Sequence, residues 1–432
     1  MWSDDFVSKT LLFSHSGFSD QDANGQTMKK LLSAWPPEEK AEFYCDVQPP
    51  DYSAAHRYFR LTDVQVMKSF LGKKSRYVLD WDGSQQNENA GKSAGKKADA
   101  RKIPAWLKKY KYNFVLKWVR EYLRILSPQW KKEYVQWLEA AAPDVLIYMV
   151  GESIFLDKLV LKACEKIGKP LVLYNGEAYR LIDLKKRKGL ERAYYRKVEK
   201  LYARLDEKAS LAIYNSEMLK AEYMAKYAHP AKAIVAYNSA ECGYTPYGPG
   251  DSMNITYFGN LGVGRSDSLI QVAKILENID PALELDIYGN ATEENKQKFR
   301  VQKNICYHGF VNAAQLREII SASDILLHVE SFDPEIVPKL KYAFSTKIAQ
   351  CLCSGRCFVS YAPKEAASSA YLESQGFPVA GDETALGEQL TQMIKDDSAR
   401  KECAARAEEI GKKNHRQSET ARMIRETLEA LI

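Results

Sequence analysis

The stretch DILLHV at residues 324–329, followed by FSTKIAQCLCSG at 344–355 and CFVSY at 357–361, decides the fold. The first and last pieces are short apolar runs, which are typical of parallel strands buried on both faces. The middle piece begins with hydroxyl residues able to cap a helix, places Ile348, Cys351 and Leu352 on one side, and stops at Gly355. The stretch therefore predicts a strand, a helix and a second parallel strand.

The first turn of this helix is a candidate anion site. Ser345, Thr346 and Lys347 stand at the start of the helix, where unpaired backbone amides and the positive end of the helix dipole favour a phosphate group. The ammonium of Lys347 would add a full positive charge. The pattern favours a diphosphate, and an ordinary crossover helix with a solvated lysine is the alternative.

Length and composition indicate a globular protein with two domains. At 432 residues the chain is too long for one ordinary core, and we expect two domains of roughly 200 residues each. Its 45% hydrophobic and 27% charged residues are typical of a soluble protein. No run of 18 or more apolar residues exists, and residues 1–5 lack the pattern of a signal peptide. We therefore expect a cytoplasmic location.

Basic residues concentrate in the first half of the chain. Residues 1–245 hold 41 Lys and Arg against 30 Asp and Glu, whereas the remainder holds 21 against 26. Residues 83–102 contain almost no large apolar side chain, so we expect a mobile basic insertion there.

A strongly amphipathic helix is expected within residues 104–132. Its apolar face would carry Val115, Trp118, Val119, Tyr122 and Leu126, and its charged face Lys117, Arg120, Glu121 and Arg124. One interpretation is peripheral contact with an anionic membrane, with lysines toward the headgroups and aromatic rings at the acyl boundary. The other is a domain-surface helix with a solvated basic face.

Two polar residues of the first half follow predicted strands. A strand at 10–14 leads into a small, polar loop that begins with His15 and contains Gly17, and a strand at 170–177 ends at Glu177. Because such sheets place ligands at the carboxyl ends of their strands, His15 is predicted to face a ligand cleft. A solvated loop histidine is the alternative.

The best linker of the chain lies at residues 241–252, where proline and glycine cluster. We predict an N-terminal domain at residues 1–245 and a C-terminal domain at residues 246–410. The helical residues 411–432 would cross back to the first domain.

The second half restarts the pattern with a glycine-rich loop. A strand at 254–258 is followed by GNLGVGRSD at 259–267. The small residues let backbone amides approach phosphate oxygens, and Arg265 can pair with those oxygens in fork geometry. The third glycine of a dinucleotide fingerprint is replaced by Asp267, which disfavours an oxidoreductase.

The order of these motifs resembles the donor domain of GT-B glycosyltransferases of the large retaining family 4. The matching motifs are YFGNL at 257–261, IYG at 287–289, YHGFV at 307–311, ASDILL at 322–327, STKI at 345–348 and SGR at 354–356. The resemblance covers residues 250–405 well. The first half is similar more loosely, through Gly17, Gly25, the strand ending in Glu177 and YNSE at 214–217.

This resemblance implies an α/β fold with two Rossmann-like domains facing each other across a cleft. The second domain would bind a nucleotide sugar and the first an acceptor, with no metal and no cofactor. Arg265 and Lys347 resemble the basic pair on the diphosphate. The donor-binding residues that sequence and resemblance indicate together are Gly17, Asn260, Gly262, Gly289, Phe310, Val311, Asp333, Glu335, Ser345, Thr346 and Gln350.

Two positions depart from the family pattern. The family's pair of glutamates falls on Tyr342 and Gln350 here. Gln350 could still hold a ribose hydroxyl, and Asp333 and Glu335 in the preceding loop are candidates to contact sugar hydroxyls instead.

The predicted activity is transfer of a hexose from a UDP- or GDP-sugar to a lipid-linked or saccharide acceptor. We expect retention, no metal, no nucleic-acid partner, and a role in cell-surface polysaccharide synthesis at the inner membrane face. Arg265, Lys347 and the helix amides would stabilise charge on the leaving diphosphate. His15 or Glu177 would orient the acceptor hydroxyl.

Two alternatives stay open. The missing glutamates also fit a catalytically silent GT-B protein that binds nucleotide sugar as a scaffold or regulator. Asp80 and Asp82 have the spacing with which metal-dependent GT-A enzymes hold an ion, but the surrounding pattern lacks a single continuous GT-A sheet, and we interpret both as turn residues.

Overall fold

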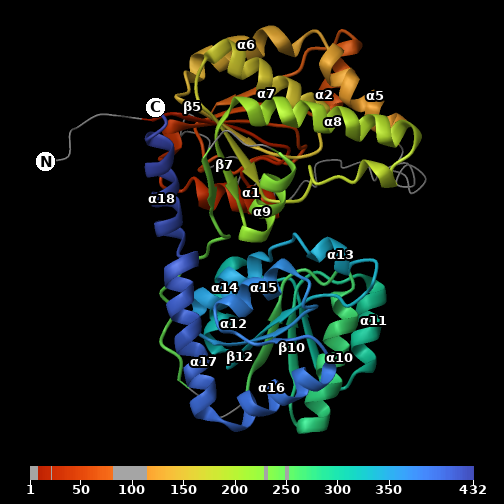
Figure 1. Ribbon diagram of the computed structural model, residues 1–432, viewed down its shortest axis with the longest axis vertical. Coiled ribbons are helices and arrows are strands. Elements are labelled where there is room, and N and C mark those ends of the chain that lie inside the picture. Colours follow the sequence, from red (N-terminus) through yellow and green to blue (C-terminus); the bar gives the residue numbers. More distant parts are fainter. Residues whose placement is uncertain (1–7, 21, 81–113, 228–231, 249–252) are drawn as a thin grey trace, which may run out of the picture. The chain divides into compact units, whose positions relative to one another are not determined.

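The computed structural model describes residues 8–20, 22–80, 114–227, 232–248 and 253–432. The chain divides into two compact units, the first comprising Met1–Ala236 with Ala421–Ile432 and the second comprising Tyr237–Thr420. Each unit contains one mostly parallel β-sheet covered by helices (Figure 1). The predicted α/β class with two Rossmann-like domains is confirmed.

The sheet of the first unit has eight described strands in the order β4-β3-β2-β1-β5-β6-β7-β8. All neighbours are parallel except β3 and β4. The strands are β1 (Thr10–Phe13), β2 (Lys40–Tyr44), β3 (Arg57–Arg60), β4 (Val78–Asp80), β5 (Val145–Met149), β6 (Leu171–Asn175), β7 (Ala209–Tyr214) and β8 (Lys232–Val235).

The described helices of this unit include the last helix of the chain, whose Ile424 and Leu428 enter the core of the first unit. The helices are α1 (Ala23–Leu31), η1 (Pro37–Glu39), α2 (Asp63–Phe70), α5 (Phe114–Leu126), α6 (Trp130–Ala141), α7 (Ile154–Ile167), η2 (Leu184–Lys186), α8 (Gly189–Lys208), α9 (Glu217–Lys226) and α18 (Gln417–Glu429).

The second unit is built on a parallel sheet in the order β11-β10-β9-β12-β13-β14. Its strands are β9 (Ile255–Phe258), β10 (Leu285–Tyr288), β11 (Ile305–Gly309), β12 (Ile325–Val329), β13 (Cys357–Tyr361) and β14 (Val379–Ala380). Its helices are α10 (Arg265–Ile279), α11 (Glu293–Val301), α12 (Ala313–Ala322), α13 (Val337–Leu340), α14 (Thr346–Ser354), α15 (Ala367–Ser374), α16 (Glu383–Lys395), α17 (Asp397–Ile410) and the π-helix η3 (Gly411–His415).

The strand order places a switch point in each sheet. In the first unit the chain runs outward from β1 to β4 and returns on the other side of β1 with β5; in the second it runs from β9 to β11 and returns beside β9 with β12. Ligands of open α/β sheets bind at the carboxyl ends of the strands next to such points.

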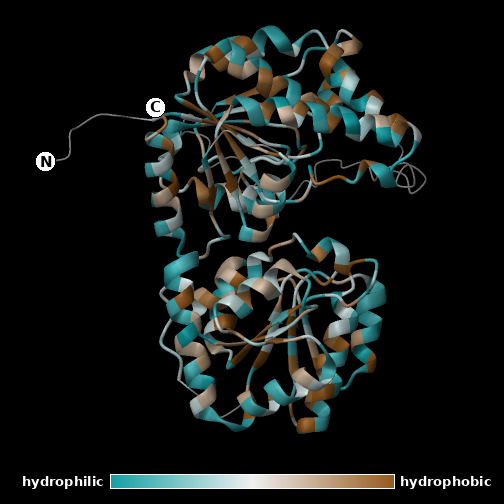
Figure 2. Ribbon diagram, in the orientation of Figure 1, coloured by the Kyte–Doolittle hydropathy of each residue, from teal (hydrophilic) through white to brown (hydrophobic). Residues whose placement is uncertain are grey.

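Hydrophobic residues of the strands contribute to the cores of both units, and in Figure 2 many strand residues have the brown colour of hydrophobic residues. The segment β12–α14–β13 follows the sequence prediction closely, and Ile348, Cys351 and Leu352 of α14 are fully buried against the sheet. Among the described helices, none is long and apolar enough to cross a bilayer.

Two local predictions are wrong. Asp80 is the last residue of β4 and pairs with Arg57 in antiparallel register, so it belongs to a strand and not to a turn. The predicted solvated charged face of α5 is wrong in part: Arg120 is exposed, but Glu121 and Arg124 are buried and hydrogen-bonded within the unit. Asp82, residues 83–102, residues 104–113 and residues 249–252 of the predicted linker lie outside the described part of the chain.

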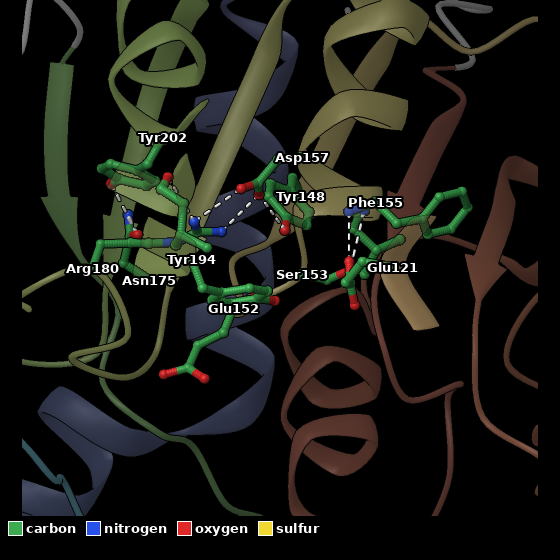
Figure 3. Close-up of polar contacts among 12 residues, drawn as sticks. Glu121, Tyr148, Glu152, Ser153, Phe155, Asp157, Asn175, Arg180, Tyr194 and Tyr202 are labelled. Atoms are coloured by element: carbon green, nitrogen blue, oxygen red, sulfur yellow. Dashed lines mark hydrogen bonds and ion pairs between the residues drawn. The ribbon is translucent and has the colours of Figure 1, made fainter. Parts of the chain in front are cut away.

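A buried ion pair anchors the loop after β6 (Figure 3). The Arg180 guanidinium donates to both carboxylate oxygens of Asp157 at 2.9 and 2.6 Å, and neither side chain is exposed. Tyr148 donates to the same carboxylate at 2.8 Å. Since Arg180 follows Glu177 by three residues, this pair fixes the segment that carries one of the predicted acceptor-site residues.

Replacing Asp157 by leucine should destabilise the first unit by about 3–5 kcal/mol, because the substitution leaves a guanidinium buried without its counter-charge. Urea unfolding measures this loss. Glu426→Leu, in an exposed ion pair with Arg422 on α18, is the control and should cost no more than about 1 kcal/mol. Equal stability of Asp157→Leu and the parent would contradict the role assigned to the pair.

Candidate functional site

The candidate site of the second unit lies at its switch point, where β9 and β12 end and α10 and α14 begin. Gly259 follows β9 directly, Arg265 is the first residue of α10, and Glu330 follows β12 directly. Lys347 lies in the first turn of α14. The topology therefore brings together residues that are up to 88 positions apart in the sequence.

Two glycines allow the backbone to come close at this point. A Cβ atom on Gly289 would lie 2.0 Å from the carbonyl oxygen of Gly259, and the φ of Gly289 is +152°. A Cβ atom on Gly259 would lie 2.8 Å from Cδ of Lys347. The missing side chain of Gly289 thus lets the Gly259 backbone come close, and that of Gly259 leaves room for the Lys347 side chain.

A buried carboxylate holds the arginine of the site. Glu330 Oε2 accepts a hydrogen bond from Nε of Arg265 at 2.8 Å and forms an ion pair with its terminal nitrogen at 2.7 Å. On the other side, Nε2 of His328 lies 3.4 Å from Glu330 Oε1, and Nδ1 of His328 is 3.0 Å from the Ser360 hydroxyl. Glu330 therefore fixes the orientation of the Arg265 side chain.

Lys347 is held by an aromatic ring. Its ammonium donates to the Tyr257 hydroxyl at 2.7 Å and lies 4.3 Å from the centre of the same ring. The Tyr257 hydroxyl in turn donates to the carbonyl oxygen of Asn260 at 2.8 Å, in the glycine-rich loop. This chain of contacts links the lysine of α14 to the loop between β9 and α10.

The charges of the site are strongly coupled. Burial lowers the pKa of Lys347 to about 7, with Glu330 acting in the opposite direction and Arg265 adding to the decrease. Burial also raises the pKa of Glu330, but its imidazole neighbour and the two cations outweigh burial and bring that pKa to about 2. At neutral pH the site thus holds an ionised carboxylate, a charged arginine and a lysine close to its titration midpoint.

The start of α14 has the features expected of an anion site. Ser345 is the N-cap residue, but its side chain makes no capping hydrogen bond to the helix. Thr346 is exposed and Gln350, one turn later, is half-buried. The first amides of this helix therefore have no side-chain cap from Ser345.

The other predicted donor-site residues of this unit lie at strand ends and in loops. Phe310, after β11, is 69% exposed, and Val311 beside it is half-buried. Asn260 Oδ1 accepts from the Gly262 amide at 2.7 Å. Asp333 and Glu335 are exposed in the loop before α13, where the Asp333 carboxylate accepts from the Glu335 amide at 2.8 Å.

The predicted residues of the first unit lie at its own strand ends. His15 and Glu177 are exposed in the loops after β1 and β6, and Gly17 is buried. Tyr223 donates its hydroxyl to the carbonyl oxygen of Glu177 at 2.9 Å. The structure thus places His15, Gly17 and Glu177 in loops after the carboxyl ends of β1 and β6.

Three residues that orient the candidate site residues were not predicted from the sequence. Tyr257 and Glu330 orient the two cations, and Glu42 on β2 holds the His15 loop by accepting from the Phe18 amide at 2.8 Å. Burial raises the pKa of Glu42 to about 8. A charged residue within or directly after an apolar strand is the signal that could have found both glutamates.

Comparisons with known proteins support the fold of a glycosyltransferase. A family model described as glycosyl transferase-like matches residues 265–426. No curated protein matches the chain. Among solved structures, HepE of Anabaena in complex with UDP has 13% sequence identity and a TM-score of 0.64, over 98% of this chain and 100% of that one.

The chain has the GT-B fold of glycosyltransferases. Sucrose-phosphate synthase from Thermosynechococcus elongatus has 11% identity and a TM-score of 0.60, over 98% of this chain and 99% of that one. The lipopolysaccharide outer core galactosyltransferase WaaB has 12% identity and a TM-score of 0.52, over 96% and 99%. At these identities the likeness concerns the GT-B fold, and the assignment to retaining family 4 stays a prediction.

Gly289→Ala should destabilise the second unit by about 2 kcal/mol or more, because the new Cβ would collide with backbone at a φ that L-residues rarely adopt. Thermal unfolding measures the loss. Gly248→Ala is the matched control, since a Cβ there would have no heavy atom within 4 Å. The close approach at Gly259 would be disproved if both variants melted at the temperature of the parent.

Proposed function

We propose that this chain is a glycosyltransferase that transfers a sugar from a UDP-sugar, with the diphosphate bound in the second unit. The observation that carries the proposal is the arrangement of Arg265 and Lys347 around Glu330 beside the start of α14. Two cations and a helix start without a side-chain cap from Ser345, at a switch point, are suited to a diphosphate. HepE of Anabaena forms a complex with UDP, which favours uridine over guanosine as the base.

The same groups have a catalytic role in this proposal. As the bond between sugar and diphosphate breaks, negative charge develops on the phosphate oxygens. Arg265, the protonated Lys347 and the amides of α14 stabilise that charge, and their fixed positions remove the need for reorganisation. This charge stabilisation is the contribution for which other transferases use a metal ion, and we propose metal-independent transfer.

The remaining assignments complete the proposal. The exposed ring of Phe310 and the backbone at Val311 contact the base, Gln350 contacts the ribose, and Asp333 and Glu335 contact the sugar. His15 and Glu177 orient the acceptor, a saccharide or lipid-linked saccharide of a cell-surface polysaccharide. We propose retention, in which the departing phosphate takes the proton of the acceptor hydroxyl.

Release of UDP from labelled UDP-sugars in the presence of saccharide acceptors, with and without a chelator, tests this function. Turnover that survives the chelator supports metal-independent transfer. A catalytically silent scaffold that binds nucleotide sugar is the second candidate, because Tyr342 and Gln350 stand where the family has two glutamates. Tight binding of UDP-sugars without release of UDP to any lipid-linked or free acceptor would favour it.

Lys347→Met should weaken UDP-glucose binding about 10- to 100-fold, because a buried charge-assisted hydrogen bond contributes about 1.5–3 kcal/mol. The methionine keeps most of the side-chain volume, so the fold should persist. Isothermal titration calorimetry measures the change, with Lys274→Met, an exposed lysine of α10, as control. Unchanged affinity in Lys347→Met would remove the phosphate role of this lysine.

Binding of UDP-glucose should also depend on pH. The diphosphate favours the protonated lysine, so the complex takes up a proton whenever free Lys347 is neutral. Affinity should therefore be constant below the pKa of about 7 and fall by roughly tenfold per pH unit between pH 7 and 8.5. The Lys347→Met variant should lack this slope, and a parent protein without the slope would contradict the shifted pKa.

A further inference from the structure

Helix α5 buries two of its charged residues and exposes several apolar ones. Its Glu121 and Arg124 side chains are buried, with residue exposures of 4% and 1%, whereas Val119 and Leu126 are 46% and 62% exposed. Tyr122 lies between these two apolar residues in the sequence and is also exposed. Val119, Tyr122 and Leu126 are three and four residues apart, so they form one stripe along the helix.

Specific contacts fix this orientation. Glu121 Oε2 accepts from the Ser153 hydroxyl at 2.7 Å and from the Phe155 amide at 2.6 Å, at the start of α7 (Figure 3). Arg124 forms an ion pair with Asp63 of α2 at 2.7 Å. Rotating α5 to bury its apolar stripe would break both contacts, so the outward stripe is a property of the folded unit.

The neighbouring helix α2 also exposes apolar residues. Asp63, its first residue, contacts α5, and its buried residues include Gln65 and Val66. Its exposed apolar residues are Val64, Met67, Phe70 and, just after the helix, Leu71. We call a group of seven exposed apolar residues from the two helices and the residue after α2 the α2–α5 face; they are Val64, Met67, Phe70, Leu71, Val119, Tyr122 and Leu126.

Basic side chains accompany this face. Lys68, Lys73 and Lys74, within and after α2, are exposed and form no ion pair among the described residues. The indole of Trp118 donates to the carbonyl oxygen of Leu190 at 3.4 Å, which brings the start of α8 beside α5. The residues before Leu190 are the exposed basic run at 185–188.

A further lysine lies directly on the stripe. Nζ of Lys158, on α7, is 5.3 Å from the centre of the Tyr122 ring. Partial burial, together with the like charges of Lys197 and Lys162, lowers its pKa. Cations of α2 and the residues after it, of α7 and of the segment before α8 therefore accompany exposed apolar residues on the same unit.

We propose that the α2–α5 face is a docking surface for an anionic lipid bilayer. Apolar side chains on two adjacent helices can enter the acyl boundary while the surrounding lysines contact acidic headgroups, and each lysine adds to the attraction. A second copy of this chain is a poorer occupant, because a symmetric contact would bring equal basic rims together. The proposal goes beyond sugar transfer and can fail or succeed independently of it.

Co-sedimentation of the full chain with phosphatidylglycerol–phosphatidylcholine vesicles tests the proposal, with pure phosphatidylcholine vesicles as reference. The parent should bind the anionic vesicles and lose binding as salt rises. Val119→Asp should weaken partitioning about tenfold or more, because it replaces a membrane-buried methyl pair with a charge. Val301→Asp, an equally drastic change at an exposed valine of the second unit, should bind like the parent.

A second pair of variants separates charge from apolar contact. Lys73→Glu with Lys74→Glu should reduce binding to anionic vesicles about tenfold or more, whereas the charge-matched control Lys274→Glu with Lys303→Glu should leave it unchanged. Failure of the parent to bind anionic vesicles, or equal losses in test and control variants, would overturn the proposal. So would a parent dimer that Val119→Asp converts to a monomer without any effect of lipid, since the face would then join two copies.

Discussion

The structure of the candidate donor site depends on one buried carboxylate, Glu330. Two like charges, Arg265 and Lys347, lie near each other in largely buried surroundings, which is costly unless a counter-charge lies between them. Glu330 supplies that charge by an ion pair with Arg265 at 2.7 Å. Even so, burial leaves Lys347 with a pKa of about 7. The free site is thus short of negative charge, and a diphosphate would supply it.

The parallel sheet makes this arrangement possible. Neighbouring strands end at the same edge, so Gly259, Gly289 and Glu330 meet although the sequence separates them. Gly289 lets the Gly259 backbone come close, Gly259 leaves room for the lysine side chain, and the carboxylate orients the arginine. Buried carboxylates also hold loops of the first unit. Glu42 accepts a hydrogen bond from the loop of His15, and Asp157 binds Arg180, which fixes the loop of Glu177.

The sequence predicted the elements whose signals are local. The strand–helix–strand segment β12–α14–β13 could be predicted from its sequence. The signals were the apolar runs of the two strands and the hydroxyl and glycine residues at the ends of the helix. Glu330 and Tyr257 were not found, because their roles depend on contacts across the sheet that no local pattern records. The burial of Glu121 and Arg124 on α5 was not predicted, since hydrophobicity alone cannot show that Glu121 accepts hydrogen bonds at the start of α7.

The pKa of Lys347 tests directly whether this lysine binds the diphosphate of the donor. NMR of protein labelled with ¹³C at lysine Cε, assigned with the Lys347→Met spectrum, would follow its titration without and with UDP-glucose. We expect a pKa of about 7 in the free protein and a clear increase in the complex, because the diphosphate favours the charged lysine. An ordinary lysine pKa in the free protein, unchanged by UDP-glucose, would contradict it.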